Sequence, residues 1–279
     1  MTSRFEPGAA RAPRVVTSLQ NEQVKFARSL RMRKVRRETG LFLVEGAAII
    51  ISARDAGWHP RTLIYAASER GSPAADELVA WAGRCGADCL EVSEAVLAKL
   101  ASKENPQSVM AVFEQRWAPA PDARSVPQDG TWLVLEEVRD PGNLGTIIRT
   151  ADAVGAQGIV LVGPSCDPYS PEATRATMGS IFSVPLVRLD RPQLLDWIKE
   201  WPGDVVGTHL SATADFRSTA YRGPTLLAMG SEGSGMSNEL MQACTKLVKI
   251  PMAGRLDSLN LAIATALALY QIRGPFLKL

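Results

Sequence analysis

The stretch EEVRDPGNLGTIIRT, Glu136 to Thr150, follows the apolar run TWLVL and leads into a helix-like pattern. Open α/β sheets bind their ligands at the carboxyl ends of strands. The loop between this apolar strand and the following helix lies at such an end. The stretch has no Gly-x-Gly-x-x-Gly, no Gly-Lys-Ser or Gly-Lys-Thr, and no histidine. It therefore indicates an α/β fold whose ligand loop is neither a dinucleotide fingerprint nor a P-loop.

The helix after this loop has a clear apolar side. If it begins near Asn143, helical spacing places four apolar residues on one buried stripe: Ile147, Ile148, Ala151 and Val154. The pattern thus predicts a helix that packs one face against a core.

The other side of the helix suits an anion. Asn143 can cap the helix, whose free N–H groups attract negative charge. Gly145 would leave open space one turn before Arg149, so that the guanidinium could lie along a phosphate. A helix cap followed by an ordinary surface arginine is the alternative that this loop alone leaves open.

Further buried strands are predicted on the C-terminal side of TWLVLEEV. They are the runs GIVLVG, VVGTHL, TLLAMG and KLVKIP, whose Val, Leu and Ile content is typical of a parallel sheet covered on both faces. Three strands run into polar or glycine-rich loops: RDPGNLG, GSEGSGMS and PMAGRLDSLN. Because ligands bind outside the carboxyl ends of parallel strands, we expect these three loops to form the walls of one pocket.

The second and third loops carry polar groups beside glycines or a helix start. Glu232 stands among three glycines, which permit close approach of the backbone to a ligand. A plain turn that caps a helix at Ser237 is the alternative interpretation. In the third loop Ser258 and Asn260 precede an Ala- and Leu-rich helix, and Ser258 could instead be only its N-cap.

Outward from this region, the segment WAPAPDARSVPQDG is rich in proline and divides the chain. Before it, the strand-like runs LFLVEG, TLIYA, CLEV and VMAVFE alternate with helical patterns, which predicts a small α/β sandwich. We predict a basic flexible tail over residues 1–20, a small α/β domain over 21–115, a linker over 116–128 and a second α/β domain over 129–279.

The net charge of +2 hides an uneven distribution. Residues 1–37 hold ten Lys and Arg residues against two acidic ones, a net charge of +8, so the other 21 basic and 27 acidic residues sum to −6. A polyanion is the expected partner of such an arm, although a solvated helix face is the alternative. The basic residues predicted to contact this polyanion are Arg28, Arg31, Arg33, Lys34, Arg36 and Arg37.

The cysteines and the apolar segments argue against a disulfide-linked secreted protein, a zinc protein and a membrane-spanning protein. The four cysteines are too sparse and irregular for a secreted disulfide framework, and with two histidines they offer no zinc-ligand spacing. The longest apolar segment, LNLAIATALALY, is too short to span a membrane, and no secretory signal pattern opens the chain. We expect a cytoplasmic protein without a metal, with an organelle transit peptide as the alternative interpretation of the Arg-rich start.

Taken together, the three loops resemble one family. DPGNLGTIIRTADAVGAQGIVLV, LLAMGSEGSGMS and VKIPMAGRLDSLNLAIATALALYQ are similar, in this order, to the three motifs of the SpoU (TrmH-like) branch of the SPOUT RNA ribose 2′-O-methyltransferases. QNEQVKFARSLRMRKVRRETGLFLVEG resembles the L30e-like substrate-binding domain that many members carry. The motifs cover about 140 residues of the chain.

The resemblance implies an α/β-knot fold with a deep C-terminal trefoil knot, bound S-adenosyl-L-methionine, and a homodimer whose active site takes residues from both subunits. By motif position it implies a cofactor site formed by Leu227, Gly230, Ile250, Met252 and Leu259. It implies a polar active site formed by Asn143, Arg149, Glu232, Ser258 and Asn260. Ala262 stands where the family commonly has serine, which places one helix-start hydrogen bond in question.

The implied function is methyl transfer to a ribose 2′-hydroxyl, with ribosomal RNA favoured over transfer RNA because of the L30e-like domain. A non-catalytic RNA-binding or ribosome-assembly protein is the alternative from another class, and a nucleotide-binding oxidoreductase is the most distant one. A 2′-hydroxyl is a poor nucleophile and needs placement and help with its proton. Arg149 is the family's proposed base, but an arginine side chain keeps its proton at neutral pH and so accepts another group's proton poorly. We therefore expect it to polarise the hydroxyl and stabilise the developing alkoxide.

Overall fold

The computed structural model of the chain describes residues 12–101 and 107–278, and it contains two compact units. Unit 1 comprises residues up to Gln115 together with Tyr169–Phe182, and unit 2 comprises Arg116–Pro168 and Ser183–Leu279. The predicted tail of residues 1–20 lies in part outside the described residues.

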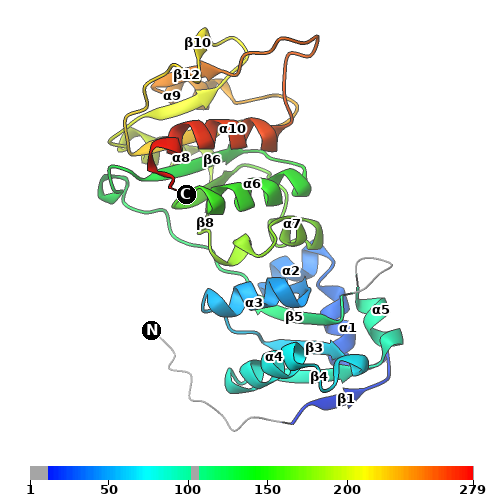
Figure 1. Cartoon of the computed structure of the whole chain (residues 1–279). Helices are drawn as coiled ribbons and strands as arrows, with labels where there is room; N and C mark the ends of the chain where they lie inside the picture. The colour runs from blue at the N-terminus through cyan, green and yellow to red at the C-terminus, as the bar shows by residue number, and fades with distance from the viewer. Residues whose placement is uncertain (1–11, 102–106, 279) are drawn as a thin grey trace. The chain divides into compact units, whose positions relative to one another are not determined.

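Unit 1 is a five-stranded mixed sheet with helices on both faces (Figure 1). The strand order is β1-β4-β3-β5-β2; β4 is parallel to β1 and β3, whereas β5 is antiparallel to β3 and β2. The main elements are β1 (Arg14–Val16), α1 (Glu22–Ser29), α2 (Arg33–Thr39), β2 (Leu41–Glu45), α3 (Ala47–Asp55), β3 (Thr62–Ala66), α4 (Pro73–Arg84), β4 (Asp88–Val92), α5 (Glu94–Leu100) and β5 (Val109–Glu114).

The core of unit 1 confirms the alternating pattern and adds two elements. All four predicted strand runs form strands, and the apolar faces of α1 and α5 are buried against them. β1 and α5 were not predicted from the sequence. Because Arg14, Val15 and Val16 pair with β4, this part of the predicted flexible tail is a strand of the sheet.

The basic residues between 25 and 37 lie on and between two helices, α1 and α2. α1 ends at Ser29 and α2 begins at Arg33. The Arg36 guanidinium Nη1 donates to the carbonyl oxygens of Leu30 at 2.8 Å and Arg31 at 2.7 Å, just beyond the end of α1. A helix end leaves such carbonyls without helical partners, so Arg36 stabilises the break between the helices.

A segment from the C-terminal half of the sequence completes the core of unit 1. Tyr169–Phe182 contains α7 (Pro171–Ala176) and the 3₁₀ turn Ser180–Phe182. The ring of Phe42 lies 4.6 Å from that of Tyr169, and the ring of Trp58 lies 4.9 Å from that of Phe182, whose carbonyl accepts the Trp58 indole N–H at 2.9 Å. The predicted boundary after residue 128 therefore does not describe this segment.

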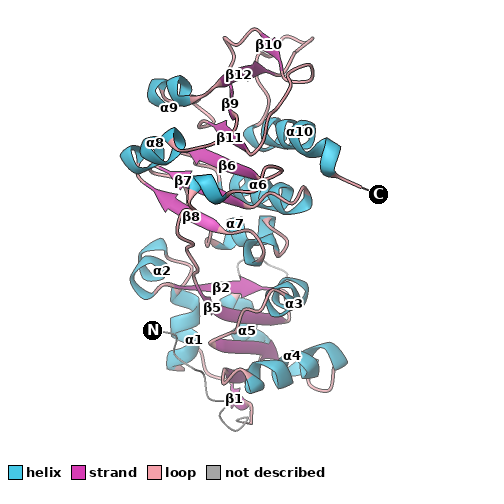
Figure 2. Cartoon of the chain, turned by 90° about the vertical axis from the view of Figure 1, so that its left-hand side faces the viewer, coloured by secondary structure: helices cyan, strands magenta, loops and turns pink. Residues whose placement is uncertain are grey.

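Unit 2 is a seven-stranded, all-parallel sheet in the order β10-β12-β9-β11-β6-β7-β8. Figure 2 shows α6 and α10 on one face and α8 and α9 on the other. The elements are β6 (Thr131–Glu136), α6 (Pro141–Ala153), β7 (Gly158–Val162), β8 (Leu186–Leu189), α8 (Arg191–Lys199), β9 (Val205–Thr208), β10 (Ala214–Asp215), β11 (Thr225–Met229), α9 (Asn238–Ala243), β12 (Lys246–Lys249) and α10 (Leu261–Arg273).

The predicted strands of unit 2 are confirmed. TWLVLEEV, GIVLVG, VVGTHL, TLLAMG and KLVKIP contain β6, β7, β9, β11 and β12, all parallel and covered on both faces. The short strands β8 and β10 were not predicted. The implied trefoil knot concerns how the C-terminal loops thread past one another, and it stays a prediction.

The proline-rich segment packs on unit 2. Ala123 and Val126 are buried in the core of this unit, and the Arg188 guanidinium lies 3.9 Å above the centre of the Trp117 ring. In the described part of the chain, no helix is long and apolar enough to cross a membrane, and no group of three metal-ligating side chains occurs.

Candidate active site

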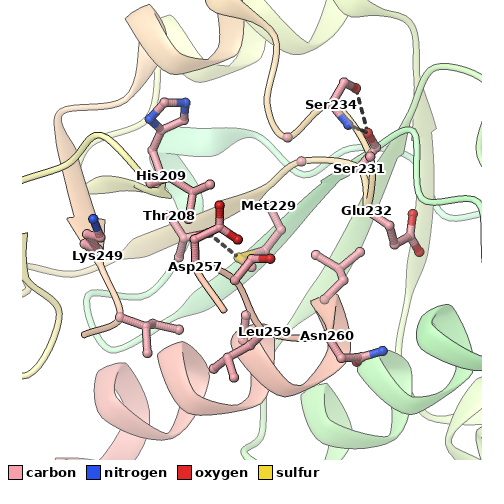
Figure 3. Close-up of a pocket in the computed structure, with 18 of the residues that line it drawn as sticks. Thr208, His209, Met229, Ser231, Glu232, Ser234, Lys249, Asp257, Leu259 and Asn260 are labelled. Carbon is pink, nitrogen blue, oxygen red and sulfur yellow. Dashed lines mark hydrogen bonds between the residues drawn. The ribbon is translucent and has the colours of Figure 1, made fainter. Parts of the chain in front are cut away.

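A pocket of about 610 Å³ lies at the carboxyl ends of β9, β11 and β12 in unit 2 (Figure 3). Its walls come from residues 208–210 at the end of β9, 229–235 at the end of β11, 248–250 and Met252 at the end of β12, and 257–261 with Ala264 at the start of α10. The second and third predicted loops thus line one pocket. The first loop does not line it, but it is joined to both of them by hydrogen bonds.

The Glu232 carboxylate joins the second loop to the first. Its Oε2 accepts the backbone N–H of Arg139 at 3.1 Å, and its Oε1 accepts the backbone N–H of Asp140 at 3.3 Å. Oε1 also accepts the Asn143 side-chain amide at 3.1 Å. The carboxylate is therefore fixed by three donors from one turn of the chain.

Asn143 and Asn260 extend this connection to the third loop. The Asn260 side-chain amide donates to Asn143 Oδ1 at 2.9 Å. Asn260 Oδ1 caps α10 by accepting the backbone N–H of Ala262 at 2.9 Å and of Ile263 at 3.3 Å. The helix start that Ala262 placed in question is thus capped, and the alternative of Ser258 as the N-cap is wrong.

The first helix also begins differently from the prediction. α6 starts at Pro141, and its N-cap is Asp140, whose Oδ1 accepts the Asn143 backbone N–H at 2.7 Å. Asn143 lies inside the first turn, so the prediction of an Asn143 cap is wrong and its amide is free to serve the network. Gly145 is buried rather than bordering open space, which contradicts the second feature predicted for this helix. The predicted apolar stripe is confirmed as fully buried.

The second loop is a closed turn. Ser231 and Gly235 exchange backbone hydrogen bonds at 3.0 and 3.1 Å, and a Cβ on Gly230 would lie 2.0 Å from the backbone of Gly235. At its far end Ser237 caps α9 and donates to the buried carboxylate of Glu136, through its backbone N–H at 2.7 Å and its hydroxyl at 2.8 Å. The turn is consequently held at its middle by Glu232 and at its end by Glu136.

Electrostatics keep Glu232 ionised. Partial burial raises the pKa of its carboxyl, but the hydrogen bonds from Asn143, Arg139 and Asp140 outweigh burial and hold the pKa below its ordinary value. Nearby, burial and the carboxylates of Glu232 and Asp140 raise the pKa of the Cys166 thiol to about 12. The site therefore presents a fixed negative charge and an unreactive thiol.

Four of the five residues assigned to the cofactor by resemblance line the pocket: Gly230, Ile250, Met252 and Leu259. The fifth, Leu227, is fully buried in β11 between Leu133 of β6 and Val206 of β9. It supports the strand beneath the pocket and is not part of the wall. Among the predicted polar residues, Glu232, Ser258 and Asn260 line the pocket.

His209 lines the pocket and was not predicted from the sequence. It follows β9 directly, and its Nδ1 accepts the backbone N–H of Ser211 at 3.2 Å while lying 2.7 Å from the Ser211 hydroxyl. Figure 3 shows His209 and Lys249 on the side of the pocket away from Glu232 and Asn260. The signal was its place at the carboxyl end of the predicted strand VVGTHL.

Comparison with known proteins agrees with this geometry. Residues 130–270, about half of the chain, match the SpoU rRNA Methylase family, and residues 21–111 match the MRM3-like substrate binding domain. The chain belongs to the SpoU rRNA methylase family.

Relatives of this SpoU family member are similar over almost their whole length. A crystal structure of an AdoMet-bound rRNA methyltransferase from Sinorhizobium meliloti is 43% identical, with a TM-score of 0.88 over 95% of this chain and 99% of that one. A 23S rRNA (uridine(2479)-2′-O)-methyltransferase of Streptomyces viridochromogenes is 35% identical over 93% of this chain and 92% of its own. The 23S rRNA (guanosine(2553)-2′-O)-methyltransferase RlmP of Bacillus subtilis is 30% identical over 93% and 99%.

Two groups of predicted residues are not among those that line the pocket of this SpoU protein. Arg149 is exposed on α6 and is not among the residues that line the pocket. In unit 1, Arg28, Arg33, Lys34 and Arg37 are exposed and Arg31 is half-buried, with its Nη2 donating to the carbonyl of Leu100 at 2.6 Å. Arg36 is buried and is used to stabilise the end of α1, so its assignment to RNA binding is wrong.

Proposed function

We propose that this chain is an S-adenosyl-L-methionine-dependent methyltransferase that modifies a ribose 2′-hydroxyl of ribosomal RNA, specifically 23S rRNA. The observation that carries the proposal is the hydrogen-bonded series Glu232–Asn143–Asn260, which unites the three family motifs beside one pocket. Two relatives named as 23S rRNA 2′-O-methyltransferases support the substrate. We accordingly place the protein in the cytoplasm, where such RNA is found.

The pocket fits the cofactor in size and chemistry. Its volume of about 610 Å³ lies within the range of small-molecule sites. Ile250, Met252 and Leu259 provide apolar surface for a flat ring, and Gly230 brings backbone to the pocket wall at a position where a Cβ would not fit. S-adenosyl-L-methionine supplies an electrophilic methyl group on a positively charged sulfur. Glu232, ionised at neutral pH, supplies a complementary negative charge.

The reaction needs a group that acts on the ribose hydroxyl. Arg149 is suited to donate to the hydroxyl oxygen and to stabilise its negative charge as the proton leaves toward an RNA phosphate or water. Through their hydrogen bonds, Asn143 and Asn260 fix the Glu232 carboxylate relative to the start of α10. The pocket wall is therefore already in position when the cofactor and the ribose bind.

We also propose that a second copy of the chain contributes to this site. Apolar side chains are exposed around the third loop and along α10: Leu256, Leu259, Ile263, Leu267 and Tyr270. In α10 they recur at helical spacing, which gives one unpartnered apolar stripe. A symmetric dimer would bury this stripe, and Arg149 of one subunit would then serve the pocket of the other.

Methyl transfer from labelled cofactor tests the proposal. Ribosomal and transfer RNA from a strain that lacks the protein are offered separately, and the modified nucleotide is mapped by its resistance to alkaline cleavage. We expect label in 23S rRNA only. Label in transfer RNA would show that transfer RNA is the substrate instead. Calorimetric cofactor binding without transfer to either RNA would indicate the non-catalytic alternative.

A further inference from the structure

Exposed large apolar side chains in the described residues form two main groups. One surrounds the pocket and α10. The other lies in unit 1, where Val15 is 63% exposed, Phe26 39% and Met32 56%, with Leu19 between them in sequence. The second group lies within the region that carries the basic residues of α1 and α2, and neither the core nor the proposed dimer uses it.

Phe26 lies on the solvent side of α1. The residues of this helix that face the core are Val24 and Ala27. Each residue turns an α-helix by about 100°, so Phe26 points roughly opposite to Val24. Part of this aromatic ring is packed, but 39% of Phe26 stays exposed, so its free side is available to a partner.

Cations surround this ring in sequence and continue past the end of the helix. Lys25 and Arg28 are exposed in α1, and Lys34 and Arg37 are exposed in α2. The N-terminal 37 residues carry a net charge of +8. A second copy docked through this face would bring two strongly cationic surfaces together, which is unfavourable. A polyanion with a flat apolar group fits both features.

Unpaired nucleic acid has this chemistry. A base stacks on an aromatic side chain, and the flanking phosphates meet Lys and Arg. In a duplex the bases are stacked on one another, and the RNA major groove is too narrow for side chains to read. An exposed phenylalanine among cations therefore favours an RNA loop or bulge over a continuous duplex.

We propose that Phe26 is a base-stacking residue, and that unit 1 recognises an unpaired nucleotide whose neighbouring phosphates contact the exposed Lys and Arg residues of α1 and α2. The proposal rests on the proposed RNA-directed function and deepens it. It assigns single-stranded RNA, held by ring and charge together, as the ligand of this surface.

Binding of the full chain to two fluorescent RNAs tests this assignment. One RNA is a hairpin with an unpaired loop, and the other is a blunt duplex of equal length. We expect Phe26→Leu, which keeps an apolar side chain without a ring, to weaken hairpin binding about tenfold. The salt dependence of binding should not change, because no phosphate contact is lost. Phe26→Tyr should bind like the wild type, and duplex binding should be the same in all three proteins.

A matched charge variant separates the two parts of the surface. Arg28→Gln combined with Arg37→Gln should reduce the slope of log affinity against log salt, for both RNAs, by roughly one to two units. Hairpin binding by Phe26→Leu equal to that of the wild type would overturn the proposal while leaving the methyltransferase function intact. A loss of affinity that is as large for the duplex, or a change in sedimentation of the free protein, would overturn it too. Failure of the wild-type chain to bind any RNA would instead count against the proposed function.

Discussion

At the scale of single residues, Glu232 carries the connection between the loops. It is bound by two backbone N–H groups and one side-chain amide, all from residues 139–143. Those donors favour the ionised carboxylate, so protonation must weaken the attachment of the second loop. The same charge is available to a cationic ligand in the pocket.

The lowered pKa of Glu232 predicts a pH-dependent stability. Its contribution is fully present above the ordinary pKa of 4.5 and is lost as pH falls below 4.5 through the lower folded-state pKa. Glu232→Gln keeps the shape but not the charge. We expect this variant to melt below the wild type at pH 7 and the two melting temperatures to converge below pH 4. A constant difference from pH 7 to pH 3 in thermal unfolding would contradict this assignment.

Arg149 gives the sharpest catalytic prediction. If it stabilises charge that develops only during transfer, Arg149→Ala should lower the single-turnover rate about 10²-fold or more and leave cofactor affinity nearly unchanged. Arg149→Lys should recover little, because a point charge does not reproduce the guanidinium fork. Single-turnover transfer and calorimetry on the same preparations measure both. Near-wild-type transfer by Arg149→Ala would make it an ordinary surface residue.

At the scale of elements, the spacing of apolar residues predicted the long strands and the buried stripe of α6. Burial of these elements requires apolar side chains at regular positions, so it leaves a pattern in the sequence. The short strands β1, β8 and β10 have too few residues to show a pattern. The cap of α6 could have been predicted correctly, since Asp140 before Pro141 is a common helix start. The separation of α1 from α2 could not, because the burial of Arg36 against the end of α1 depends on tertiary structure.

The exposed stripe of α10 predicts the interface between subunits. Ile263 is exposed in the first turn of this helix, and a charge there would be buried without a partner in the proposed dimer. At micromolar concentration we expect the wild type to sediment as a dimer and Ile263→Asp to sediment as a monomer. Leu19→Asp, an exposed apolar position in unit 1, serves as the control and should stay dimeric. A dimeric Ile263→Asp variant would place the interface elsewhere.

At the scale of the whole molecule, one segment belongs to a different unit from the sequence on either side of it. The family match over residues 130–270 includes Tyr169–Phe182, yet this segment packs in the core of unit 1. A single domain boundary near residue 116 was predicted because the composition of the chain changes there. Composition could not reveal the later segment, since the contacts of Tyr169 and Phe182 are made with aromatic residues more than 100 positions away.

Gly179 tests this arrangement. Its φ of +106° is unfavourable for other residues, and a Cβ there would lie 2.6 Å from Ser52 Oγ and 2.7 Å from Ser52 Cβ on α3. We expect Gly179→Ala to destabilise the protein by about 1–3 kcal/mol. Gly254→Ala is the control, because a Cβ at Gly254 would meet no atom within 4 Å.

Hydrogen exchange of the Gly179→Ala variant should locate the damage. If Tyr169–Phe182 is part of the core of unit 1, exchange should accelerate at the amides of β2 and β5, although residue 179 lies in the sequence range of the methylase family. The amides of β11 and β12, in unit 2, should keep their wild-type protection. Local opening follows the unit whose packing is disturbed. Faster exchange only in β11 and β12 would therefore show that the segment packs in unit 2 rather than in unit 1.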